Sequence, residues 1–76
     1  MEPLRERIIN VLRKIEKPPT LLDLRNRVNI EGGWENFVMP DEFDEAIKML
    51  QEEGVIEVQI KQGSRIGNLV LLREKR

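Results

Sequence analysis

The 76-residue chain is long enough for one small domain, and its formal net charge of −1 is not that of a typical nucleic-acid-binding protein. The sequence contains no cysteine and no histidine, which excludes disulfides, cysteine/histidine zinc sites, histidine general bases and cysteine nucleophiles. No apolar run approaches the ~20 residues of a membrane span, and the first residues lack the apolar stretch of a signal peptide, so we expect a cytoplasmic protein.

The charge is unevenly distributed along the chain. Residues 40–54 include six acids and one lysine, a net charge of −5, whereas the other twelve basic and eight acidic residues give +4. The sign of the surface that meets a partner therefore matters more than the total. A charged fraction of 36% without cysteine also suits a thermophilic protein.

A first helix is predicted to begin near Pro3, because proline fits the first helical turn, where its missing N–H is not needed. Its apolar stripe repeats at helical spacing and consists of Leu4, Ile8, Val11 and Ile15. Pro18 and Pro19 end this helix, since a proline disfavours the helical conformation of the residue before it. Ile9 lies off the stripe and belongs either to a broad buried face or to a self-association surface.

A short second helix is predicted over residues 21 to about 28. Thr20 has the character of an N-cap, and Asp23 follows three residues later in a capping-box-like arrangement. An ion pair between Asp23 and Arg27 would add a few tenths of a kcal/mol. The residues expected to face the core are Leu21, Leu24 and Val28.

Residues 29–39 read as irregular structure. Gly32 and Gly33 interrupt any regular pattern, and the connection is longer than the three or four residues of a tight helix-turn-helix. Trp34 and Phe37 are large apolar residues that need burial. We therefore expect them to fold back over the core as a lid. The alternative for Trp34, as for Ile9 and Met49, is a place in a self-association surface.

A third helix is predicted over residues 40–54. Its apolar residues fall on one helical face and are Phe43, Ala46, Ile47 and Leu50. Gly54 follows the helix at the point where a left-handed residue is needed, a conformation that glycine adopts without steric cost.

A hairpin completes the predicted α+β fold. Residues 55–61 alternate as in a strand, residues 69–73 form its partner, and the glycines and asparagine between them are turn residues. We expect residues 1–76 to form a single domain with a frayed tail over 74–76.

The order of these elements resembles that of the winged helix-turn-helix family. The best match is the sequence EEGVI at residues 52–56, where the third helix turns through glycine into the first strand. The resemblance covers nearly the whole chain and implies a winged-helix domain with a two-stranded β-hairpin wing. Many members of this family are transcriptional regulators that place the third helix in the major groove, and others bind proteins in transcription or replication assemblies.

The basic hairpin tip is better suited to DNA than the third helix is. Three of the four outward residues of that helix are acids, which phosphate repels. We expect a transcriptional regulator that binds duplex DNA, as a dimer, mainly through backbone contacts from the wing and the second helix. The candidate DNA-binding residues are Arg25, Arg27, Lys61, Gln62, Ser64 and Arg65.

The second hypothesis is a protein–protein interaction module that docks on a basic partner. Its contact surface is the outward face of the third helix, formed by Asp41, Glu45, Lys48 and Glu52. For both surfaces the simpler interpretation is an ordinary solvated face. No glycine-rich phosphate loop follows a strand, so we expect no enzymatic activity, no cofactor and no metal site.

Overall fold

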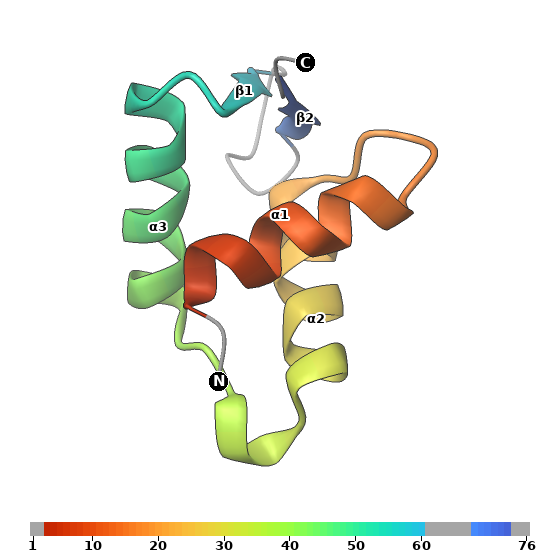
Figure 1. Cartoon of the computed structure of the whole chain (residues 1–76), viewed down its shortest axis with the longest axis vertical. Helices are drawn as coiled ribbons and strands as arrows, with labels where there is room; N and C mark the ends of the chain where they lie inside the picture. The colour runs from red at the N-terminus through yellow and green to blue at the C-terminus, as the bar shows by residue number, and fades with distance from the viewer. Residues whose placement is uncertain (1–2, 61–67, 74–76) are drawn as a thin grey trace.

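Three helices precede a two-stranded antiparallel hairpin in the computed structural model, which describes residues 3–60 and 68–73 (Figure 1). The elements are α1 (Leu4–Lys14), α2 (Leu21–Gly32), a short 3₁₀ turn η1 (Trp34–Asn36), α3 (Pro40–Glu52), β1 (Ile56–Gln59) and β2 (Leu69–Leu72). This arrangement confirms the expected α+β class. No helix within the described ranges is long and apolar enough to cross a membrane.

α1 begins where Pro3 predicts, with Pro3 as its N-cap, but it ends earlier than the prolines require. Ile15, predicted as the last residue of the helical stripe, is already extended, so the helix stops at Lys14. Ile9 is buried together with Ile8 and Leu12, so the broad buried face is correct and Ile9 is not part of a self-association surface.

α2 is four residues longer than the sequence predicts, ending at Gly32 instead of near Val28. Thr20 is the N-cap as expected, because its hydroxyl accepts a hydrogen bond of 3.1 Å from the Asp23 N–H, but the Asp23 side chain does not complete a capping box with the described residues. Its end is set by Gly33, whose φ of 72° and ψ of −179° only glycine adopts readily. The helix therefore extends beyond Val28, the last residue of its apolar stripe, and ends where Gly33 adopts a conformation that is incompatible with a helix.

α3 ends in a Schellman motif. The Val55 N–H donates to the Leu50 carbonyl and the Gly54 N–H donates to the Gln51 carbonyl, both at 3.0 Å, with Gly54 at φ 76°. This geometry confirms the predicted left-handed glycine between α3 and β1.

The two strands pair in antiparallel register, with Ile56 opposite Leu72 and Gln59 opposite Leu69. A short segment between α1 and α2 also pairs with β2, which the sequence did not reveal. The Val70 N–H donates to the Pro19 carbonyl at 2.9 Å, and the Leu21 N–H donates to the Asn68 carbonyl at 3.0 Å. The start of α2 is therefore attached to the hairpin.

One hydrophobic core joins all three helices and both strands. Its largest completely buried side chains are Ile8, Leu24, Val28, Phe43, Leu50 and Val70. The four residues predicted to line the inner face of α3 are all buried. Their burial explains why α3 presents its charged residues to solvent.

Candidate functional site

The connection between α2 and α3 is held against α2 by one asparagine. The Asn29 Oδ1 accepts from the Val38 N–H at 2.7 Å, and the Asn29 Nδ2 donates to the Val38 carbonyl at 3.4 Å. Val38 is buried as a result. The Asn36 Nδ2 also donates to the Gly32 carbonyl at 2.9 Å, which closes the turn around η1. Val38 is thus the residue of this connection that enters the core.

Trp34 and Phe37 do not form the predicted lid. The Trp34 side chain is 91% exposed and Phe37 is 51% exposed, and their rings stack with centroids 6.1 Å apart and planes inclined by 21°. The lid prediction is wrong because Asn29 places Val38 in the core position, and the two aromatic residues that precede Val38 are left outside.

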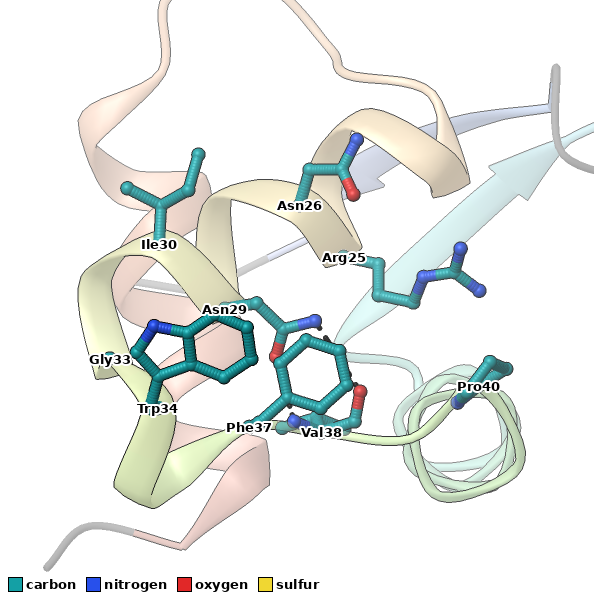
Figure 2. Close-up of a pocket in the computed structure, with 9 residues that line it drawn as sticks. All are labelled: Arg25, Asn26, Asn29, Ile30, Gly33, Trp34, Phe37, Val38 and Pro40. Carbon is teal, nitrogen blue, oxygen red and sulfur yellow. Dashed lines mark hydrogen bonds between the residues drawn. The ribbon is translucent and has the colours of Figure 1, made fainter.

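An open hollow of about 540 Å³ lies in front of this aromatic pair (Figure 2). It is lined by Arg25, Asn26, Asn29, Ile30, Gly33, Trp34, Phe37, Val38 and Pro40, and we call it the aromatic hollow. Figure 2 shows Trp34 and Ile30 at one end, Arg25 and Pro40 at the other, and Phe37 between them. Arg25 forms no hydrogen bond or ion pair with any residue that the structure describes.

The structure separates the two arginines that were predicted to share a DNA-binding surface. Arg25 lines the aromatic hollow, whereas Arg27 lines a different hollow together with Lys17 and Glu31. Two residues along a helix differ by about 200° around its axis, so these side chains leave α2 in different directions. The expected ion pair between Asp23 and Arg27 does not form. Glu31, the acid that lines the same hollow as Arg27, pairs with Lys14, with 2.7 Å between the Lys14 Nζ and the Glu31 Oε1.

The other predicted DNA-binding residues lie outside the described part of the chain. They are Lys61, Gln62, Ser64 and Arg65. The four residues of the alternative protein-binding surface are all exposed along α3, as predicted, and none of them lines the aromatic hollow. They are Asp41, Glu45, Lys48 and Glu52.

The aromatic hollow offers stacking, apolar burial and one cation rather than acid–base or metal chemistry. Within residues 3–60 and 68–73, no group of three or more acidic, histidine or cysteine side chains could hold a metal ion. Sequence reasoning missed Asn29 and Pro40 as parts of this site. The sequence did contain one signal of an exposed apolar surface here. Ile30 follows Val28 by two residues, so it cannot lie on the buried stripe of α2.

The class that the fold defines is a small α+β domain of three helices and an antiparallel hairpin. A scan against protein-family models and searches of curated proteins and solved structures found no match to the chain.

Proposed function

We propose that the chain is a winged-helix domain. The order of three helices and a hairpin supports this proposal, as does the Schellman junction at Gly54. The attachment of Pro19 and Leu21 to β2 adds further support, because it places an extended segment between the first two helices alongside the hairpin.

The function that we propose is docking of another protein in the aromatic hollow. The observation that carries this proposal is the 91% exposure of Trp34, stacked on a half-exposed Phe37. Burying a large aromatic side chain stabilises the folded state by on the order of 3 kcal/mol. A small domain that leaves such a side chain exposed therefore gives up a large part of its possible stability. Aromatic and arginine side chains that surround a concave surface are typical of the energetic centre of a protein interface.

The surroundings of the hollow favour a partner surface without exposed acids at the point of contact. Pro40 lines the hollow and begins α3, whose exposed acids follow immediately with Asp41. Asn26 and Arg25 supply polar groups at the rim, which orient a partner without a strong charge requirement. This proposal keeps the protein–protein hypothesis but moves its centre from the acidic face of α3 to the hollow beside it.

A photo-crosslinking amino acid at position 34 tests the proposed function in cells of the source organism. The matched control is position 49, because Met49 is an apolar side chain on α3 that is 45% exposed. We expect a discrete adduct with protein from position 34 and none from position 49. Equal, diffuse labelling from the two positions would show that the hollow is an ordinary solvated surface.

Binding of duplex DNA remains a second candidate, since one observation favours it. The hydrogen bonds of Pro19 and Leu21 with β2 attach the start of α2 to the hairpin. Lys17, two residues before Pro19, lines one hollow together with Arg27, and both are exposed and form no ion pair with the described residues. In this proposal they extend the basic tip, formed by Lys61, Gln62, Ser64 and Arg65, along the DNA backbone, with Arg25 outside the DNA contact.

A titration with random-sequence duplex DNA at several salt concentrations tests the second candidate. Contacts with phosphates make log K fall linearly with log[salt], and the double variant Lys61→Glu/Arg65→Glu should weaken binding at low salt by at least tenfold. Lys48→Glu on α3 is the control and should change binding little. Unchanged affinity in the double variant would remove the wing from the DNA contact.

A further inference from the structure

We propose that the occupant of the aromatic hollow is a second copy of this chain, related by a two-fold axis. This inference rests on the proposed function, because it names the partner of the same docking surface. It is carried by the different chemistry of the two ends of the hollow.

The two ends are complementary to each other. Trp34 projects at one end with an electron-rich indole that is almost fully exposed. Arg25 lies at the other end, as does Pro40, and the Arg25 guanidinium has no partner among the described residues (Figure 2). An arginine over the face of a tryptophan is a favourable cation–π pair, and it is stronger where water is excluded. The two groups are held apart in one copy and therefore cannot satisfy each other within it.

A two-fold axis through the hollow would pair Trp34 of each copy with Arg25 of the other copy. In such an interface, any contact from residue i to residue j is repeated from j to i. Turning a second copy half a turn about Phe37 places each Trp34 over the Arg25 and Pro40 of the other copy. The Phe37 rings then face each other near the axis.

The charges around the hollow permit this pairing. Arg25 is the single charged residue among those that line it, and the axis would place the two copies of Arg25 at opposite ends. The exposed acids of α3 do not line the hollow. Two chains with a net charge of −1 each also repel only weakly at a distance.

The apolar area fits a weak dimer. Three large apolar side chains that line the hollow are exposed, by 79% for Ile30, 91% for Trp34 and 51% for Phe37. Because each aromatic side chain has roughly 150–250 Å² of surface, this face offers on the order of 400 Å² per copy. A standard interface buries about 800 Å² per partner, so we expect a dimer that dissociates in the micromolar range.

The single tryptophan reports on this association directly. Sedimentation velocity and Trp34 emission are measured together on the full chain from about 1 µM to 1 mM. We expect the mass to rise from that of one 9.0 kDa chain to twice that value, with a blue shift of the emission over the same concentrations. Phe37→Ala should weaken dimerisation at least tenfold, whereas Ile60→Ala, on an apolar side chain that is 86% exposed elsewhere, should leave it unchanged.

A mixing experiment tests the two-fold arrangement. Arg25→Ala and Trp34→Ala each remove both cation–π contacts from their own dimers, so each variant alone should dissociate at least tenfold more easily. A heterodimer of the two variants keeps one intact contact, between Trp34 of the first and Arg25 of the second. Because Trp34→Ala contains no tryptophan, adding it to Arg25→Ala should blue-shift the emission at concentrations where neither variant associates alone.

The outcomes separate this inference from the proposed function. A wild-type chain that stays monomeric with unshifted Trp34 emission overturns the second copy, and so does mixing that gives no tighter heterodimer. Equal weakening by Ile60→Ala and Phe37→Ala also overturns it, because the interface would then lie elsewhere. Adducts from position 34 to a chain of another mass would overturn the second copy and keep the docking function, whereas no adduct and no dimer would overturn both.

Discussion

Within residues 3–60 and 68–73, two turns pass through a glycine with positive φ, and they lead to opposite results. After Gly54, at φ 76°, the chain enters β1 and buries Ile56 at once. After Gly33, at φ 72°, the chain enters η1 and exposes Trp34 almost completely. A glycine with positive φ therefore precedes a buried segment in one case and an exposed segment in the other.

The difference shows what determines burial after a turn. At Gly54 the carbonyls of Leu50 and Gln51 are satisfied within the turn itself, and the strand that follows has a partner in β2. At Gly33 the chain has no strand to join, and a single side chain, Asn29, selects Val38 for the core. A local cap and the pairing of β1 with β2 determine the first turn, whereas one side-chain contact between residues nine apart in sequence determines the second.

The largest expected effect contrasts two phenylalanines. Phe43→Ala removes a completely buried ring and should lower the free energy of unfolding by about 3–5 kcal/mol, or prevent folding. Phe37→Ala removes a half-exposed ring and should lower it by less than about 1 kcal/mol. Urea unfolding followed by circular dichroism measures both. A loss above about 2 kcal/mol for Phe37→Ala would mean that this ring is part of the core.

The two glycines offer a second contrast. A Cβ at either position would meet no atom within 4 Å, so backbone strain alone decides the effect of each substitution. Gly33→Ala should cost about 1–3 kcal/mol, because a ψ of −179° at this φ is essentially confined to glycine. Gly54→Ala should cost about 1 kcal/mol as a left-handed cap. Thermal unfolding of both variants tests this order, and a milder effect at Gly33 would contradict it.

Asn29 connects the two regions in a third test. Asn29→Ala leaves the backbone N–H and carbonyl of Val38 without these partners and should cost about 1–2 kcal/mol. Asn26→Ala is the matched control, since Asn26 lines the same hollow without a hydrogen bond to the described residues. Chemical unfolding should separate the two variants. Equal stability would show that Val38 holds its position without the asparagine.

The smallest expected effect concerns the start of α2. Thr20→Ala should cost about 1 kcal/mol, because the N–H of Asp23 loses its capping hydroxyl, whereas Thr20→Ser should cost little. Hydrogen exchange of the first turn of α2 measures the local effect. Unchanged exchange in Thr20→Ala would mean that the hydrogen bond from Leu21 to Asn68 holds this end alone.

The sequence predicts the fold better than the candidate site for a physical reason. The helical spacing of Phe43, Ile47 and Leu50 and the capping residues Thr20 and Gly54 are local signals, and all of them are correct in the structure. The aromatic hollow depends on which of several apolar residues enters a core that is already nearly filled. That choice follows from tertiary contacts, which no spacing along the chain contains.

The candidate DNA-binding residues of the wing and of the second helix show the same limit of prediction from sequence. Arg25 and Arg27 are close in sequence, but two residues that are two apart on a helix point in different directions, and these two line different hollows. Lys61, Gln62, Ser64 and Arg65 lie outside the described residues, and their contribution stays a prediction.

The pairing of Pro19 and Leu21 with β2 has a consequence for how the protein folds during synthesis. The N-terminal part of the domain needs Asn68 and Val70 to complete its backbone hydrogen bonds, and this contact joins distant parts of the chain. When only α1 and α2 have emerged from the ribosome, the nascent chain is therefore incompletely folded and its apolar core residues are exposed. Contacts this far apart slow folding, and we expect the nascent chain to gain protection from proteases in one late step, when β2 emerges.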